Sequence, residues 1–339
     1  MKTFINTCIH FFKKETVLCI AGFLAFISAF FVHPSAAYMG YIDFRVLSLL
    51  FSLMLVVAGF QSIGLFHCLG SALLTKVHTT RQLILVLSLL CFFSSMFITN
   101  DVALLTFVPF AIMILTIAGQ QKFLISTIVL QTIGANLGSM FTPVGNPQNL
   151  YLASAFSLST GTFLIRMFPL TALSLVLLVA AACMLPSTPV DIASQTAAER
   201  PEPKKLAVYL VLFMTCLGCV SHLIPYPVML VLVLITLLFI NRTLFQKADY
   251  FLLLTFVFFF LFIGNVQNIP AVSDLLHKLI RGRELGAGIL LSQCISNVPA
   301  AILLSGFTDQ VISLLYGVNI GGLGTLIASL ASLISYRFY

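Results

Sequence analysis

The sequence contains no tryptophan, and only 8% of its residues are Asp, Glu, Lys or Arg. Soluble domains carry roughly 25% charged residues, so this scarcity excludes an ordinary water-soluble fold. The net charge of +7 requires no nucleic-acid partner, because Lys and Arg gather in the cytoplasmic loops of membrane proteins. Hydrophobic residues make up 60% of the chain. We therefore expect an integral, multi-pass membrane protein in contact with the lipid bilayer.

Motifs of catalysis and cofactor binding are also missing. The chain has no His-Glu-x-x-His, no Gly-x-Ser-x-Gly and no nucleotide-binding loop, so we expect neither an enzyme nor a cofactor other than a coupling ion. Its eight cysteines lie mostly within apolar runs, where they pack as small hydrophobic side chains. Cys216, Cys219 and His222 have no evident fourth ligand, which leaves Na⁺ as the one metal ion we expect.

Interrupted apolar runs of helix length predict an all-α polytopic bundle of about ten membrane segments rather than a barrel. The run 16–32 follows Lys2, Lys13 and Lys14, which predicts a retained first helix and a cytoplasmic N-terminus. The one long hydrophilic stretch, 186–205, is typical of a cytoplasmic linker. This divides the chain into a first repeat with its N-terminal helix (1–185), the linker (186–205) and a second repeat (206–339).

The segment 134–149 holds three glycines, two prolines and three asparagines inside an apolar stretch. Such a composition predicts that a transmembrane helix opens here and that its free peptide groups line a cavity. A second copy follows at 317–332. The copies match at four pairs of positions, which are Gly134 with Gly317, Asn136 with Asn319, Gly138 with Gly321 and Thr142 with Thr325. Paired breaks of this kind mark the binding sites of transporters.

The two halves align beyond these broken segments. Asp43 and Gln61 are 18 residues apart, as are Asp249 and Gln267, and Thr99-Asn100 matches Ser296-Asn297. Each half therefore repeats an Asp-capped helix, an interfacial helix, a hairpin with a hydroxyl-Asn tip and a broken helix. The number of membrane crossings between the copies is odd whether the hairpin is re-entrant or spans, so the second repeat is expected to be inverted.

Two kinds of ligand suit these elements. The half-helices that start at Asp101 or Val102 and at Val298 turn free N–H groups inward, which favours an anion. Opened carbonyls and asparagine side chains favour Na⁺ or a proton-carrying water. Asp101 is the one acid in the deep apolar region and is expected to couple a cation, with a structural N-cap as the alternative. For the asparagines, the alternative role is hydrogen bonding between helices.

These motifs resemble the ion transporter superfamily, which includes divalent-anion/sodium symporters, citrate permeases, arsenite permeases and related sodium/proton antiporters. The similarity runs from about Arg45 to the end of the chain. It implies a homodimer with an elevator-like transport domain, and substrate contacts from the hairpin tips and the broken segments. The candidate substrate-binding residues are Thr99, Asn100, Thr142, Pro143, Ser296, Asn297 and Thr325. The candidate cation-binding residues are Asn100, Asp101, Gly134, Asn136, Gly138, Asn146, Asn149, Asn297, Gly317, Asn319 and Gly321.

The sequence departs from the family pattern in three respects. The third tip positions are Asp101 and Val298 rather than Thr, which leaves room for another anion, a neutral oxyacid or sodium/proton exchange. In the second half Ser329, Leu330 and Ser332 replace Asn146, Pro147 and Asn149, so we expect two unequal cation sites. Family members have another helix after the second broken segment, so we expect either a fragment or a shortened member.

The expected function is secondary active transport of a small anion, either a carboxylate or an inorganic oxyanion, coupled to Na⁺ or H⁺. The expected location is a bacterial cytoplasmic membrane. The alternative is a sodium/proton antiporter that uses Asp101. A non-transporting membrane subunit or an intramembrane enzyme is a third alternative, which no motif supports.

Overall fold

The computed structural model describes residues 15–74, 77–190 and 201–338. Lys2, Lys13, Lys14 and the middle of the proposed linker lie outside the described residues. Over the described ranges, the chain forms α-helices joined by short turns and two 3₁₀ segments, without a β-strand. The helices are α2 (Thr16–Phe31), α3 (Tyr38–Tyr41), α4 (Phe44–Ser62), α5 (Leu65–Leu74), α6 (Thr80–Ser94), α7 (Asn100–Ile117), α8 (Leu124–Ser139), α9 (Pro147–Ala155), α10 (Thr160–Cys183), α11 (Pro203–Val220), α12 (Tyr226–Ile240), α13 (Tyr250–Gln267), α14 (Pro270–Ile280), α15 (Glu284–Ile295), α16 (Asn297–Ser305), α17 (Val311–Gly321) and α18 (Leu330–Phe338).

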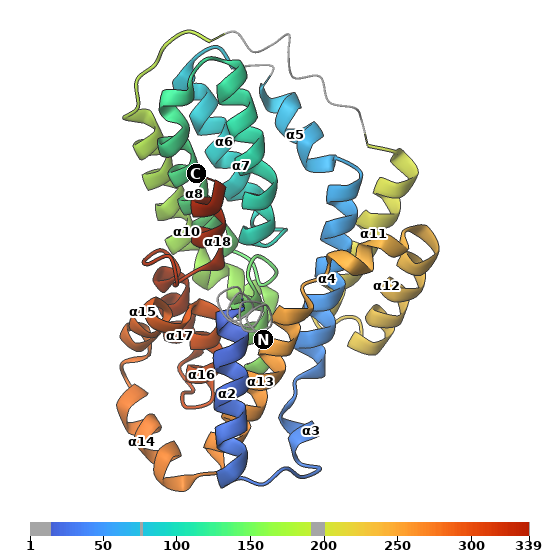
Figure 1. Ribbon diagram of the computed structural model, residues 1–339, viewed down its shortest axis with the longest axis vertical. Helices are drawn as coiled ribbons and strands as arrows, with labels where there is room; N and C mark the ends of the chain where they lie inside the picture. Colours follow the sequence, from blue (N-terminus) through green and yellow to red (C-terminus); the bar gives the residue numbers. More distant parts are fainter. Residues whose placement is uncertain (1–14, 75–76, 191–200, 339) are drawn as a thin grey trace, which may run out of the picture.

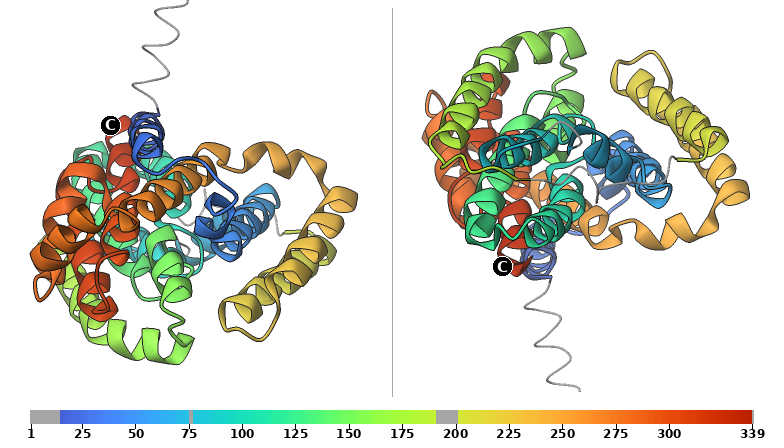
Figure 2. Two further views of the ribbon diagram at one scale, coloured as in Figure 1. Left: turned by 90° about the horizontal axis from the view of Figure 1, so that it is seen from below. Right: turned by 90° about the horizontal axis from the view of Figure 1, so that it is seen from above.

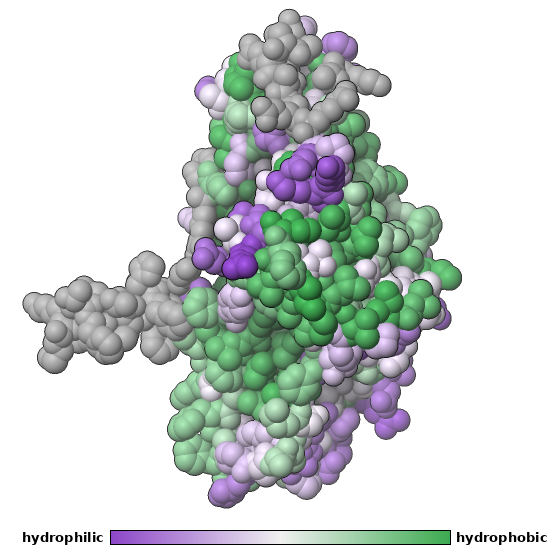
Figure 3. All heavy atoms as spheres, turned by 90° about the vertical axis from the view of Figure 1, so that its right-hand side faces the viewer, coloured by the Kyte–Doolittle hydropathy of each residue, from purple (hydrophilic) through white to green (hydrophobic). Residues whose placement is uncertain are grey.

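Length and composition allow five of these helices to cross a membrane, namely α4, α7, α10, α11 and α13. Large apolar side chains point outward, as Phe239 of α12 shows with 84% of its surface exposed. Figure 3 shows hydrophobic residues gathered in a broad band on the side of the molecule where α11 and α12 lie. An apolar surface of this extent is suited to lipid rather than water. The predicted all-helical, polytopic membrane fold is confirmed.

The two hairpins that carry the predicted tips lie toward opposite ends of the molecule, although the halves interleave, since α2 and α3 pack on α13 and α18 packs on α7 and α8. In Figure 1 the hairpin of α6 and α7 lies in the upper half, and that of α15 and α16 in the lower half. The ends of the two hairpins that carry the predicted tips approach each other near the middle. This is the arrangement of an inverted repeat, in which equivalent elements enter from opposite sides.

The two aspartates that the alignment pairs both cap their helices, as predicted. Asp43 accepts a hydrogen bond from the Val46 N–H at 3.0 Å, and Asp249 accepts one from the Leu252 N–H at 2.9 Å. Each therefore satisfies a free N–H group at the start of its helix, α4 or α13. The matched glutamines also act alike. Gln61 donates to the Thr106 hydroxyl of α7, and Gln267 donates to the carbonyl of Gly306 that follows α16.

Helices α11 and α12 form a peripheral hairpin that packs on α4, as the end-on views in Figure 2 show. The hairpin is fastened to α4 through Arg45. One nitrogen of its guanidinium donates to the carbonyl of Cys219 at 2.9 Å, and the other lies 2.8 Å from Nδ1 of His222. Because arginine only donates, Nδ1 of His222 must be the unprotonated acceptor.

Acidification is expected to loosen this contact. Burial and the neighbouring Arg45 charge lower the pKa of His222 below its ordinary value of 6.5, so the contact favours the neutral imidazole. The stabilisation is therefore present above pH 6.5 and is lost as the pH falls through the lowered pKa. The thermal unfolding temperature of the purified protein should therefore fall between neutral pH and about pH 5.

The His222→Asn variant supplies the control. Asparagine tolerates the positive φ of 60° at this position and offers Arg45 a carbonyl acceptor that does not titrate. The variant should lose this component of the acid sensitivity. Identical pH profiles for the two proteins would contradict the assignment.

The helix breaks are shorter than the sequence predicted. α8 continues through Gly134, Asn136 and Gly138 to Ser139, and α17 continues to Gly321. The open segments are 140–146, termed the first break, and 322–329, termed the second break. Both breaks therefore lie inside the predicted segments, 134–149 and 317–332, but each occupies only part of its segment. Glycine lowers helix propensity by only about 1 kcal/mol, which tertiary packing can offset.

Candidate functional site

The hairpin tips and the breaks are joined by backbone hydrogen bonds that repeat in the two halves. In the first half, the Asn100 N–H donates to the carbonyl of Gly145 at 3.3 Å. In the second, the Asn297 N–H donates to the carbonyl of Ala328 at 2.9 Å. Each break therefore folds back against the start of its hairpin's second helix, α7 or α16.

The matched threonines Thr142 and Thr325 also repeat one contact. Thr142 donates its hydroxyl to the carbonyl of Met96, and Thr325 donates its hydroxyl to the carbonyl of Gln293 at 3.1 Å. Met96 and Gln293 occupy equivalent positions, each three residues before its tip. In the structure both threonines thus fix a break to the preceding hairpin helix, while their predicted contact with substrate stays a prediction.

The predicted glycines lie where broken helices cross hairpin helices. A Cβ on Gly138 would collide with the carbonyl of Phe92 in α6, and a Cβ on Gly321 would lie 2.7 Å from Cβ of Ser292 in α15. Gly134 and Gly317 make the equivalent close approaches, to the carbonyls of Ser88 and Leu285. The structure gives these glycines a packing role. Cation binding by their peptide groups stays a prediction.

Amide side chains meet where the tips and breaks converge. Asn100 of α7 donates to Oδ1 of Asn136 at 2.9 Å, and the Ser329 hydroxyl donates to the same oxygen at 2.9 Å. In the first break, Asn146 donates to the Ser139 hydroxyl at 2.7 Å. Ser139 in turn donates to the carbonyl of Asn136 at 3.0 Å. These side chains are all at least 95% buried, so they form one internal polar cluster.

A second set of bonds extends this cluster into α17. Asn319 donates to Oδ1 of Asn149 at 2.7 Å, and Asn149 donates to the carbonyls of Ser139, Met140 and Thr142. Asn149 thereby satisfies carbonyls that the first break leaves without helical partners. Since Asn319 and Ser329 come from the second half, both halves build the cluster. We term this set of residues (100, 136, 139, 146, 149, 319 and 329) the amide cluster.

Several oxygens near the amide cluster have no hydrogen-bond donor. Among the described residues, the buried unpartnered side-chain atoms include Oδ1 of Asp101, Asn146 and Asn319. Leaving a buried oxygen unpaired costs about 1–3 kcal/mol, so each such atom requires an explanation. Carboxylate and amide oxygens are the ligands that hard cations prefer. The three oxygens are therefore suited to a cation.

The environment of Asp101 fits the same chemistry. Its backbone N–H lies in the first turn of α7, where no helical acceptor is available, and donates to Oδ1 of Asn100 at 3.0 Å. Over the part of the chain that the structure describes, the one salt bridge joins Lys205 and Glu202, so Asp101 has no paired basic side chain. An intramembrane acid without a counter-ion has the chemistry to hold a proton or a metal cation.

The remaining predicted substrate residues lie around the amide cluster. Ser296 has a positive φ of 76° and points its hydroxyl to the carbonyl of Ala328 and to Asn297. Thr99 precedes α7 and is half-buried, Pro143 is buried in the first break, and Thr325 is exposed. The tips are thus brought to the cluster, whereas Thr325 lies at the surface.

Sequence reasoning missed two members of the amide cluster. Ser139 links Asn136 to Asn146, and Ser329 was identified as a replacement for Asn146 but not as a site residue. The available signal was the position of Ser139 three residues after Asn136, which places the hydroxyl and the carbonyl of Asn136 on one helix face. The described residues contain no group of His, Cys, Asp or Glu that could hold a metal ion by itself.

Comparisons with known proteins agree with this architecture. Residues 4–313 match the citrate transporter family. The chain is 33% identical to the inner membrane protein YbiR of Escherichia coli over 87% of its length and 80% of YbiR. It is 32% identical to a transporter of Methanocaldococcus jannaschii over 87% of its length and 81% of that protein. A segment covering 38% of the chain and 26% of the relative is 31% identical to the silicon efflux transporter LSI3 of Oryza sativa. The inverted helical repeat is therefore that of a membrane transporter and not of an enzyme, and this chain belongs to the citrate transporter family.

Proposed function

We propose that the chain is a secondary transporter in which the amide cluster and the two tips bind a small oxygen-bearing solute together with Na⁺ or H⁺. The observation that carries this proposal is the set of buried, unpartnered oxygens on Asp101, Asn146 and Asn319. They lie beside two tips whose second helices, α7 and α16, begin in the protein interior. Oxygens suit the cation, and helix N-termini suit the anionic part of the solute.

The cargo class follows from the charge of the site. α7, α8, α9, α16 and α17 contain no Lys, Arg or His, so the anion must be balanced by helix N-termini and by the coupling cation. The family description names citrate, and the rice relative is named for silicon. These two names do not agree on one chemical class. We therefore keep a carboxylate or an inorganic oxyanion as the proposed cargo.

A sodium/proton antiporter is the second candidate, and Asp101 is the observation that favours it. A buried carboxylate without a basic partner can exchange a proton for Na⁺ without any organic solute. The discriminating measurement is proton movement driven by a Na⁺ gradient in solute-free proteoliposomes. A signal there favours the antiporter, and its absence together with Na⁺-dependent solute uptake favours the symporter.

We also propose the setting in which this transport takes place. Its elements are a homodimer in a bacterial cytoplasmic membrane, a cytoplasmic N-terminus and an elevator-like movement of the site-bearing elements. The division into repeats 1–185 and 206–339, joined by a cytoplasmic linker at 186–205, belongs to the same proposal. Crosslinking of the purified protein in lipid tests the dimer, and tags on the N-terminus test its orientation.

Cation binding is tested by thermal unfolding of the purified protein in NaCl and in choline chloride at equal ionic strength. Na⁺ at ten times its Kd should stabilise the folded state by about 1.4 kcal/mol, and the Asn146→Ala variant should lose this response. Asn241→Ala is the matched control, because Asn241 caps a short turn away from the amide cluster and its side chain bonds only with Thr243. An equal response in both variants contradicts the assignment of Asn146. No response in the wild type leaves H⁺ as the coupling ion, which uptake driven by a pH gradient then tests.

A further inference from the structure

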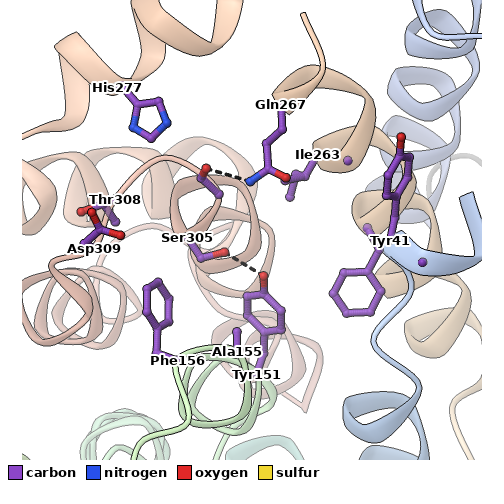
Figure 4. Close-up of a pocket in the computed structure, with 14 residues that line it drawn as sticks. Tyr41, Tyr151, Ala155, Phe156, Ile263, Gln267, His277, Ser305, Thr308 and Asp309 are labelled. Atoms are coloured by element: carbon purple, nitrogen blue, oxygen red, sulfur yellow. Dashed lines mark hydrogen bonds between the residues drawn. The ribbon is translucent and has the colours of Figure 1, made fainter. Parts of the chain in front are cut away.

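A cavity of about 460 Å³ lies outside the amide cluster, between α3, α9, α13, α14 and the segment that follows α16. Polar side chains line it, among them Tyr151, Gln267, His277, Ser305 and Asp309. Figure 4 shows the hydroxyls of Tyr151 and Ser305 turned toward each other across it, with His277 and Asp309 on another side. The volume is within the range of pockets that bind small solutes.

The lining distinguishes this cavity from a second, mainly apolar one. A second cavity, of about 390 Å³, is lined by Leu47, Leu230, Leu253, Leu254 and other mainly apolar side chains. Apolar walls suit lipid chains, whereas a cavity with convergent hydroxyl, amide, imidazole and carboxylate groups suits water and polar solutes. The first cavity therefore has the chemistry of an aqueous compartment.

Two helices connect this cavity to the amide cluster. α9 begins at Pro147 beside the cluster and α16 begins at Asn297 of the second tip, and the two helices pack against each other. Both contain 9 residues, and they reach the cavity at Ala155 and Ser305 after about 13 Å. The Tyr151 and Ser305 hydroxyls, 2.7 Å apart, join the two helices near this end.

The equivalent place in the first half is arranged differently. His67 of α5 packs edge-on against Phe110 at 4.9 Å, as His277 packs against Phe307 at 5.6 Å. Gln61, however, bonds to the side chain of Thr106, while Gln267 bonds to the backbone of a glycine, Gly306. Because Gly306 has no side chain, Ile263 and Gln267 of α13 pack directly against it, and all three residues line the cavity.

We propose that this cavity is a solute-binding vestibule, through which the oxygen-bearing cargo reaches the amide cluster from one side of the membrane, and that the Tyr151–Ser305 hydrogen bond closes its inner end. The proposal rests on the proposed transport function. The ligand is the same class of small, oxygen-rich solute, which the hydroxyl and amide groups of the vestibule hydrate on its way inward. Breaking this hydrogen bond removes one of the contacts that hold α9 against α16.

Cysteine labelling tests this assignment without requiring transport. The eight native cysteines are replaced, and single cysteines are introduced as Ala155→Cys in the vestibule and Ser329→Cys in the amide cluster. A charged, membrane-impermeant methanethiosulfonate is applied to right-side-out and to inside-out vesicles. Leu254→Cys in the apolar cavity is the control, because a thiol in hydrocarbon does not ionise and reacts slowly.

The expected result is that Ala155→Cys reacts from one side only and at least about tenfold faster than Leu254→Cys. Ser329→Cys should react slowly from that same side, and adding Tyr151→Phe should speed its reaction about fivefold, since one hydrogen bond is removed. Ser305→Ala removes the same hydrogen bond and replaces Tyr151→Phe in this experiment if Tyr151→Phe does not fold.

Two results overturn the proposal. One is an Ala155→Cys that reacts from both sides or no faster than Leu254→Cys, and the other is a Ser329→Cys rate that neither gate variant changes. Neither result depends on cargo, so a protein that carries no solute can still show the vestibule. Conversely, a transporting protein with an unreactive Ala155→Cys disproves the vestibule alone.

Discussion

Replacing Asp101 with asparagine is expected to weaken binding of the coupling cation about hundredfold. The carboxylate oxygen Oδ1 of Asp101 is buried and has no partner, so it is the strongest acceptor beside the amide cluster. A bond to a charged group contributes up to about 3 kcal/mol, which corresponds to roughly two orders of magnitude in affinity. The measurement is solute uptake into proteoliposomes as a function of Na⁺ concentration and of pH.

This substitution separates a cation site from a structural cap. Asparagine caps helices as well as aspartate does, so a capping role predicts normal transport and an unchanged thermal unfolding temperature. A cation site instead predicts a folded protein with lost coupling. In the structure the N-cap residue of α7 is Thr99 and not Asp101, and the Thr99 side chain makes no capping bond. Unchanged solute uptake in Asp101→Asn would remove Asp101 from the symporter mechanism, and unchanged Na⁺-driven proton movement would remove it from the antiporter mechanism.

The Gly138→Ala variant is expected to lose about 3 kcal/mol of stability or to fail to fold. The added Cβ would collide with the carbonyl oxygen of Phe92 and approach the Ser95 hydroxyl to 2.7 Å. A backbone carbonyl cannot rotate away, so α6 and α8 must separate. Overpacking of this kind costs typically 1–3 kcal/mol and occasionally more. Thermal unfolding of the purified protein measures the loss directly.

Gly161→Ala is the matched control, since an added Cβ at Gly161 in α10 meets nothing within 4 Å. Alanine is favoured over glycine in a helix by about 1 kcal/mol, so this variant should be as stable as the wild type or slightly more stable. A Gly138→Ala protein that unfolds at the wild-type temperature would show that α6 and α8 do not cross as closely as described. The comparison keeps the chemical change constant and varies only the surroundings.

The repeat was predictable because matched residues do equivalent work. Asp43 and Asp249 cap helices, and Thr142 and Thr325 bond the carbonyls of Met96 and Gln293, at positions that the alignment of the halves pairs. The matched spacing of these residues in the two halves therefore located the capped helices and the hairpins correctly. The same residues could not reveal where each helix opens, because glycine serves both open backbone and close helix crossings. Only the position of Phe92 opposite Gly138 distinguishes the two uses.

The partners within the site were not predictable from the sequence. Asn149 bonds Asn319 across 170 positions of the chain, and nothing in the local pattern of either residue selects the other. The vestibule is a stronger case, since its walls come from segments between Gly40 and Asp309. Such a cavity forms only when these segments pack together. In the sequence its polar residues are far apart, so no local pattern marks them as one site.

The way the two halves share the amide cluster also affects how the protein is made. Chains emerge from the ribosome N-terminal part first, so Asn136 and Asn149 enter the bilayer well before Ser329 and Asn319, which complete their bonds. Until then, amide groups suited to the finished interior must find temporary partners in water, in the translocon or in one another, because hydrocarbon offers none. During biogenesis, the polar side chains of the first half therefore gain their final partners only after the second half has been inserted.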